Sequence, residues 1–267
     1  MRRPTQAAFL ALLLALPTMA QADIDANAYT ESLREAFNAA HPDLAIDELP
    51  MVEARSPQVI KHGPRDQDPG KIALTFDACS QLGSNRLNEA VLDKLRDHQI
   101  PATLFLGGLW MADNPELTRE LHDDPQFEIA THAHGHPDLT ELTEKDIRLQ
   151  IAFAQLMSYS LTGEIPRHFR PPFVQYNETV TEIAADLGLK LVHYDIASGD
   201  ADKDLSAEEI AAQVLDNVQP GSIVVLHLHE PDLATAEALA KMLDTLEERK
   251  LKPAKISDLL ALKGTSD

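Results

Sequence analysis

The chain has 267 residues, of which 44% are hydrophobic, and a formal net charge of −20. This length suits one domain with an extension, and the hydrophobic fraction is enough for one sizeable core. So acidic a chain is a poor partner for nucleic acid or anionic membrane surfaces. It has a single cysteine, Cys79, which excludes an intramolecular disulfide.

Residues 1–22 have the form of a secretory signal peptide. Arg2 and Arg3 precede an apolar run at residues 7–16, and Ala20-Gln21-Ala22 has the small-x-small form of a cleavage site. The run is shorter than the roughly 20 residues that a bilayer requires, which disfavours an anchor helix. We therefore expect a periplasmic or secreted protein, mature from about residue 23, without stable membrane insertion.

Residues 23–69 form a separate N-terminal extension. Tyr29, Leu33 and Phe37 recur every four residues, which predicts an amphipathic helix packed against another surface. His41-Pro42-Asp43 ends this helix. Several prolines follow, up to residue 69, and indicate an extended linker.

Residues 70–262 alternate between strand-like and helix-like segments. The expected strands are 71–76, 102–106, 127–131, 168–170, 191–196, 222–228 and a short one near 253–256. The expected helices are 85–98, 143–161, one opening at Ser206-x-x-Glu209, and 233–249, with Gly163 closing the second. This order predicts an α/β fold, a distorted barrel of about seven parallel strands. In such barrels the chemistry lies at the C-terminal ends of the strands.

Polar residues of catalytic type fall at those strand ends. Asp77, His132, Arg170 and His227 each end or follow an expected strand, and Asp195 and Asp200 follow another. Scattered surface polar residues would not do this, so the pattern favours an enzyme.

His132 and His136 are spaced so that both imidazoles can face one metal ion, while His134 points elsewhere. Asp77 ends an apolar strand. Burying a carboxylate there lowers stability unless it has a partner, such as Arg170, or a functional role. An aspartate at such a place most often caps a helix or forms a structural ion pair. Similarly, a histidine such as His227, if it stood alone, would most often be a core residue. With Asp200 or Asp195 nearby, His227 could instead act as a general acid.

These segments, in this order, resemble the five motifs of the polysaccharide deacetylase family, also called the NodB-homology domain or carbohydrate esterase family 4. The five are Thr75-Phe76-Asp77-Ala78, His132-x-x-x-His136, Arg170-Pro171-Pro172-Phe173, Asp195 to Asp200, and Leu226-His227. The resemblance spans about residues 70–260.

The resemblance implies an enzyme that removes acetyl groups from N- or O-acetylated sugars of a polysaccharide or oligosaccharide. We expect the protein to be a monomer. It assigns the general base to Asp77, the residue that orients the base to Arg170, and the general acid to His227. Asp200, with Asp195 in reserve, would tune the acid. His132 and His136 would bind a divalent metal, zinc with cobalt or nickel as alternatives.

The chain departs from the family at one metal ligand. The aspartate that usually follows the base is Ala78, which cannot coordinate. Asp77, Cys79 or another carboxylate could replace it, although a lone cysteine more often packs as a small hydrophobe. The departure also raises a second hypothesis, a catalytically silent carbohydrate-binding module. A third, an amidohydrolase for small molecules, fits the signal peptide less well.

Overall fold

A computed structural model of the chain describes residues 26–50, 52–66, 70–80 and 86–261, without the side chains of residues 26–30. The predicted signal peptide lies outside these residues, as does the side chain of Tyr29. Within the described ranges, no helix is both long and apolar enough to cross a membrane.

The strands are β1 (Val59–Ile60), β2 (Gly70–Ala78), β3 (Ala102–Leu106), β4 (Phe127–Thr131), β5 (His168–Phe169), β6 (Lys190–Val192), β7 (Ile196–Ala197), β8 (Ile223–His227) and β9 (Leu251–Pro253). The α-helices are α2 (Ala26–Ala40), α3 (Glu89–Asp97), α4 (Gly108–Asp113), α5 (Pro115–Asp123), α6 (Glu144–Thr162), α7 (Glu178–Asp186), α8 (Ala207–Leu215), α9 (Thr235–Glu248) and α10 (Ile256–Leu260). Short 3-10 turns are η1 (Pro42–Leu44), η2 (Leu139–Glu141) and η3 (Pro172–Val174).

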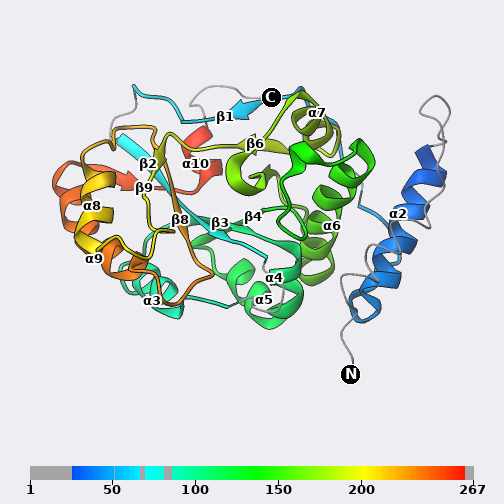
Figure 1. The fold of residues 1–267 in the computed structure, drawn as a ribbon, viewed down its shortest axis with the longest axis horizontal. Helices are drawn as coiled ribbons and strands as arrows, with labels where there is room; N and C mark the ends of the chain where they lie inside the picture. Colours follow the sequence, from blue (N-terminus) through cyan, green and yellow to red (C-terminus); the bar gives the residue numbers. More distant parts are fainter. Residues whose placement is uncertain (1–25, 51, 67–69, 81–85, 262–267) are drawn as a thin grey trace.

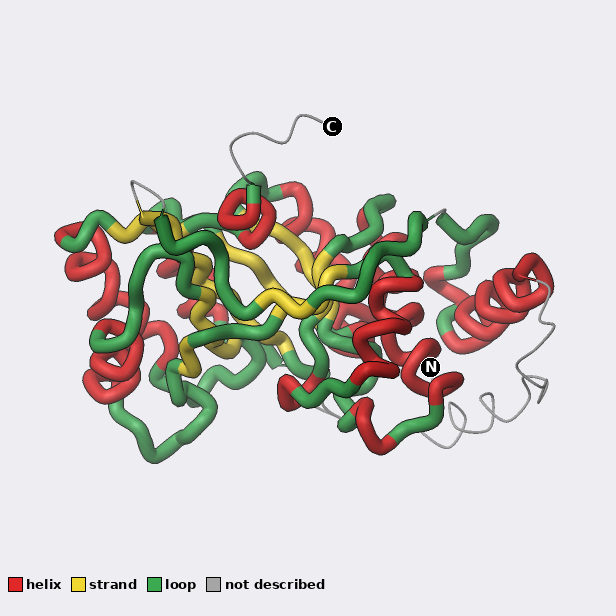
Figure 2. Tube along the Cα trace, turned by 90° about the horizontal axis from the view of Figure 1, so that it is seen from above, coloured by secondary structure: helices red, strands yellow, loops and turns green. Residues whose placement is uncertain are grey.

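The described strands form one parallel sheet in the order β1-β6-β5-β4-β3-β2-β8-β7, with β9 also paired to β2. β6 and β7 are separated only by residues 193–195, yet they lie near opposite ends of this order. That short link brings the two ends of the sheet together. The result is an incomplete (β/α) barrel, which confirms the predicted fold class. Helices surround the sheet (Figure 1), and a second view shows them on either side of it (Figure 2).

Successive residues of β2 face two different apolar layers, as the period of a strand requires. The layer between sheet and helices contains Ile72, Leu74, Phe76 and Ala78. Ala73 instead belongs to the barrel interior, with Phe105, Ala130, Ile223 and two residues of α10, Ile256 and Leu259. Helix α10 thus covers the N-terminal end of the strands and leaves the C-terminal end for polar side chains.

The predicted strands 102–106 and 127–131 are confirmed with unchanged bounds. The prediction of a single strand at 191–196 is wrong, because the segment divides into β6 and β7. At the break between the two strands, the Arg170 guanidinium donates to the carbonyl oxygens of Val192 and His193, at 3.4 and 3.2 Å. The expected linker also contains an edge strand, β1, whose Val59 is paired with Leu191.

The predicted helix signals at positions 143 and 206 are confirmed. The Thr143 side chain accepts from the amide of Asp146, and Ser206 forms a full capping box with Glu209. Helix α3 begins later than predicted, at Glu89, because Asn88 is held by the carbonyls of neighbouring loop residues. The sequence analysis did not anticipate α4, α5 or α7.

The N-terminal extension packs on the outside of the barrel against α6, and Figure 1 shows α2 beside that helix. Leu33 and Phe37 are buried, and the Phe37 ring meets Phe153 of α6 edge to face at 5.6 Å. The amphipathic helix predicted for this segment is therefore confirmed.

Candidate active site

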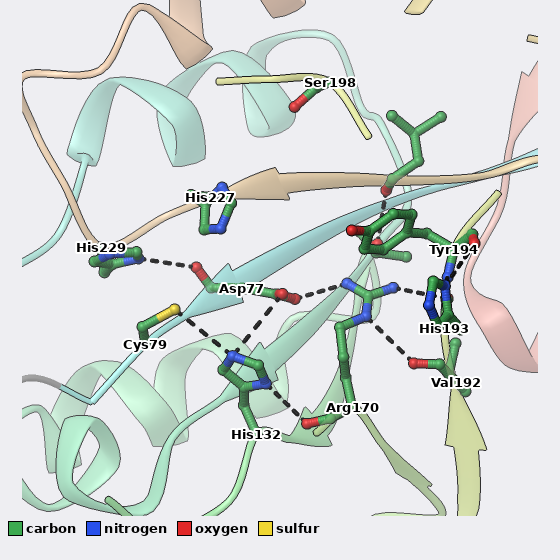
Figure 3. A network of polar contacts seen from close by, with 12 residues as sticks. Asp77, Cys79, His132, Arg170, Val192, His193, Tyr194, Ser198, His227 and His229 are labelled. Atoms are coloured by element: carbon green, nitrogen blue, oxygen red, sulfur yellow. Dashed lines mark hydrogen bonds and ion pairs between the residues drawn. The ribbon is translucent and has the colours of Figure 1, made fainter. Parts of the chain in front are cut away.

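The predicted site residues meet at the C-terminal ends of the strands, as expected for a barrel (Figure 3). Asp77 lies at the end of β2 and His227 ends β8. His132, Arg170 and Asp200 follow β4, β5 and β7. Parallel neighbours in the sheet thus carry side chains from distant parts of the chain into one cluster.

Asp77 and Arg170 form a buried ion pair. Asp77 is 3% exposed and Arg170 is fully buried, and Arg170 Nη1 donates to Asp77 Oδ1 at 2.6 Å. The guanidinium also lies 4.1 Å from the centre of the Phe105 ring. Burial alone would raise the pKa of Asp77, but the charge and hydrogen bond of Arg170, with the charge of His227, outweigh it and hold that pKa below its usual value. Asp77 is therefore an ionised carboxylate whose second oxygen remains available.

His132 is fixed with one ring nitrogen presented to the site. Its Nδ1 lies 2.8 Å from the carbonyl oxygen of Arg170, which can only accept, so Nδ1 carries the proton and Nε2 offers a lone pair. Burial lowers the pKa of His132, and with the neighbouring imidazole it lowers the pKa of His136 to about 3. Both rings are thus neutral, the form in which histidine binds metals.

Three donor atoms converge beside Asp77. His132 Nε2 lies 3.1 Å from His136 Nε2, 3.6 Å from Cys79 Sγ and 3.9 Å from Asp77 Oδ2. The sulfur and the two nitrogens all lie within 4.8 Å of one another, which makes them a candidate metal site. Burial and the nearby carboxylates raise the pKa of the Cys79 thiol.

The loop after β4 directs its histidines to two different places. Ala133 and His136 adopt positive φ angles of 58° and 62°, a left-handed conformation that is uncommon for non-glycine residues. His132 and His136 consequently face each other, with ring centres 4.8 Å apart. His134 points away from them. The centre of its ring lies 5.3 Å from that of His41 and 5.5 Å from that of Phe153.

His227 is held by Asp200. His227 Nδ1 lies 2.8 Å from Asp200 Oδ1, and Asp200 Oδ2 accepts from the His227 amide and from Thr235 Oγ1, each at 2.7 Å. Burial would lower the pKa of His227, but the hydrogen bond and charge of Asp200, with the charge of Asp77, raise it above the usual value. His227 therefore retains its proton to higher pH than an exposed histidine.

Asp195 does not contact His227. Its carboxylate pairs with Arg65 at 2.7 Å and accepts from Ser222 Oγ and the Ile223 amide. Of the two aspartates that the sequence offered as partner of His227, Asp200 is the one in contact.

Two further residues at the site were not singled out from the sequence. Phe173 is 61% exposed, and its ring lies 4.7 Å from the centre of the His136 ring. His229 is buried, with Nδ1 3.3 Å from the carbonyl oxygen of Asp77. The signals were present: Phe173 lies in the Arg-Pro-Pro-Phe segment, and His229 follows β8, two residues after His227.

Comparison with known proteins identifies the family. The sequence matches the family described as polysaccharide deacetylase over residues 65–192. The chitooligosaccharide deacetylase of Sinorhizobium fredii is 31% identical over 191 residues, which cover 67% of this chain and 86% of that protein. The chain belongs to the polysaccharide deacetylase family.

Solved structures of the same family share this fold. The Bc1960 peptidoglycan N-acetylglucosamine deacetylase is 25% identical, with a TM-score of 0.69 covering 76% of this chain and 92% of that one. BA3943 from Bacillus anthracis, described as a pseudoenzyme of carbohydrate esterase family 4, is 26% identical, with a TM-score of 0.69 covering 85% and 81%. The same fold thus occurs in a deacetylase and in a protein described as a pseudoenzyme. The fold alone does not show whether this chain is active, so the side chains of the site have to be considered.

Proposed function

We propose that this polysaccharide deacetylase is a divalent-metal-dependent hydrolase that removes acetyl groups from N-acetylated, or O-acetylated, sugars of a polysaccharide. The observation that carries the proposal is the placement of Asp77 between two groups. On one side lies the neutral pair His132 and His136, and on the other the charged pair His227 and Asp200.

The residues present fit a divalent ion. Two neutral imidazoles with facing Nε2 atoms and a thiol sulfur make a donor set suited to zinc, with cobalt or nickel as alternatives. A divalent ion held by these residues would supply Lewis acidity toward the acetyl carbonyl and the attacking water. The hydrogen bond from His132 to the Arg170 carbonyl is the kind of supporting contact that orients a ligand ring.

The protein groups divide the remaining work between them. Asp77, kept ionised by Arg170, accepts the proton of the attacking water as general base. His227, whose proton is retained through Asp200, donates to the sugar nitrogen as it leaves. One residue is thus a base and the other an acid at the same pH, because their surroundings move the two pKa values apart.

Phe173 supports a sugar as the substrate. Among the described residues, the large hydrophobic side chains that are exposed are Phe173 and Val52, and Phe173 adjoins the candidate metal ligands. An exposed aromatic ring beside a polar site gives the apolar face of a sugar ring a surface on which to stack. We infer that the substrate is an acetylated polysaccharide or oligosaccharide outside the cytoplasm. We also infer that the protein is exported, loses its signal peptide and acts as a monomer.

The connected contacts favour an enzyme over a silent sugar-binding module. A module that only bound sugar would have no need for a buried carboxylate with its own arginine, opposite an imidazole with its own aspartate. Burying those charges lowers stability unless each is paired and used.

The test is acetate release from a panel of acetylated glycans, among them N-acetylglucosamine oligomers, peptidoglycan and acetylated xylan. Wild-type protein should release acetate from at least one of them, and Asp77→Asn should abolish release while the circular dichroism spectrum stays unchanged. Asp195→Asn is the matched control, since Asp195 is a nearby aspartate without contact to the site, and it should retain activity. Sugar binding by wild-type protein without any acetate release would support the silent module instead.

A further inference from the structure

We propose that Cys79 is the third protein ligand of the metal site and replaces the carboxylate that is missing at Ala78. This inference rests on the metal site of the proposed function and specifies how that site is completed. It selects Cys79 among the replacements that the sequence left open, over the packing role that is commoner for a lone cysteine.

Two of the three separations between the donor atoms agree with tetrahedral coordination. Zinc bonds of about 2.3 Å to sulfur and 2.05 Å to nitrogen require an S···N separation of about 3.6 Å and an N···N separation of about 3.3 Å at tetrahedral angles. The corresponding separations are 3.6 Å from Cys79 Sγ to His132 Nε2 and 3.1 Å between the two Nε2 atoms. Both lie within about 0.2 Å of the requirement, so His132 Nε2 already stands at ligand spacing from each of the other two donors. The third separation, from Cys79 Sγ to His136 Nε2, is within 4.8 Å.

The register of β2 explains why position 79 can act where position 78 cannot. Ala78 is fully buried in the layer between the sheet and the helices, together with Phe76. Asp77 has the opposite orientation, toward the site, and Cys79 continues that alternation. Figure 3 shows the Cys79 sulfur beside His132, on the same side as Asp77.

Other nearby donors are less suitable. Asp77 has one oxygen bonded to Arg170 at 2.6 Å, and a move onto the metal would weaken that buried ion pair. His229 Nδ1 lies against the carbonyl of Asp77. In the part of the chain that the structure describes, Cys79, His132 and His136 form the one group of three candidate ligands within metal-binding reach.

A sulfur ligand changes which ions the site selects. As a thiolate, with its proton released to water, Cys79 carries the same unit charge as the carboxylate it replaces. A thiolate is a softer donor and favours zinc or cobalt over magnesium, calcium or manganese. With two imidazoles and one thiolate, a fourth position remains open, as in catalytic rather than structural zinc sites.

The test is direct observation of the metal–sulfur bond in the full-length protein. Protein stripped by a chelator and reloaded with cobalt alone should bind one ion per chain and show a near-ultraviolet thiolate-to-cobalt charge-transfer band. Cys79→Ala should lose the band and weaken zinc binding by at least about tenfold in a chelator competition, since even supporting residues around metal sites change affinity by about 10–100-fold.

Two variants make the result specific. Cys79→Asp should recover most of the zinc affinity without the band, because it offers an oxygen ligand at the same position. Ser80→Ala is the matched control: Ser80 is also buried, but it accepts from the Trp110 amide, so the variant should keep both the band and the affinity.

Failure of this inference is distinguishable from failure of the proposed function. If cobalt-loaded wild type lacks the band, or Cys79→Ala binds zinc as tightly as wild type, Cys79 is not a ligand, even where acetate is released. If the band appears and disappears as expected but no glycan is deacetylated, the ligand assignment stands and the proposed function fails.

Discussion

Asp200→Asn should convert the raised pKa of His227 into a lowered one. The substitution keeps the shape of the side chain but removes its charge, 2.8 Å from His227 Nδ1. A hydrogen bond to a charged group contributes about 1.5–3 kcal/mol, which corresponds to about 1–2 pKa units at 1.36 kcal/mol per unit. With that contribution gone, burial, the largest single influence on His227, would dominate and favour the neutral ring.

The assay is the pH dependence of kcat for acetate release. An acid catalyst is lost as pH rises through its pKa, so lowering the pKa moves the alkaline limb of the profile to lower pH. We expect a shift of about 1–2 pH units in Asp200→Asn, and a rate about 10–100-fold lower on the alkaline side. An NMR titration of His227 should report the same shift without substrate.

Asp195→Asn is the control, because Asp195 is bonded to Arg65 and Ser222 and has no contact with His227. Its profile should coincide with that of wild type. Coincident alkaline limbs for wild type and a folded Asp200→Asn would refute the assignment of His227 as an acid tuned by Asp200.

Three further predictions concern other parts of the site and its support. Phe173→Ala should raise KM for an oligosaccharide more than it lowers kcat, since the exposed ring can bind sugar without touching the reacting atoms; an unchanged KM would remove it from the binding surface. Arg170→Met should reduce the free energy of unfolding by about 3–5 kcal/mol, because it leaves the Asp77 carboxylate buried without its partner, and a double variant with Asp77→Asn should recover part of this loss in urea unfolding. His134, with a pKa lowered by burial to about 3, is neutral when folded but takes up a proton below about pH 6.5 when unfolded. Stability should therefore fall as pH falls, by about 2 kcal/mol between pH 7 and pH 5 from this residue, and His134→Phe should show that much less acid sensitivity than wild type.

The fold and the membership of the site were readable from the sequence because both depend on local patterns. Alternating strands and helices predicted the barrel, and the polar residues at strand ends predicted which side chains would meet. Parallel strands bring their C-terminal ends to the same edge of the sheet. The proximity of Asp77, His132 and His227 could therefore be predicted without information on tertiary contacts.

The partner of His227 was not readable in the same way. Asp195 and Asp200 are both acidic and both near β7, so the residues alone left the choice open, and only the family resemblance favoured Asp200 over Asp195. The difference comes from the tertiary structure. Asp195 accepts from the amide of Ile223, the first residue of β8, whereas Asp200 accepts from the amide of His227, the last residue of β8.

The division of residues 190–197 into two strands has a similar origin. The segment has strand propensity throughout, but at the break the guanidinium of Arg170, which follows β5, donates to the carbonyl oxygens of Val192 and His193. Cys79 is a different case. The alternation of β2 already placed it on the same face as Asp77, but the family motif directed attention to Ala78.

The most direct measurement of the central claim is acetate release by chelator-stripped protein as zinc is titrated back. The rate should be negligible at first, rise in proportion to bound metal and level off at one ion per chain. His132→Ala and His136→Ala should show no comparable rise at the same zinc concentrations. Equal rates in stripped and reloaded protein, or no acetate release from any glycan of the panel at full zinc loading, would contradict metal-dependent deacetylation.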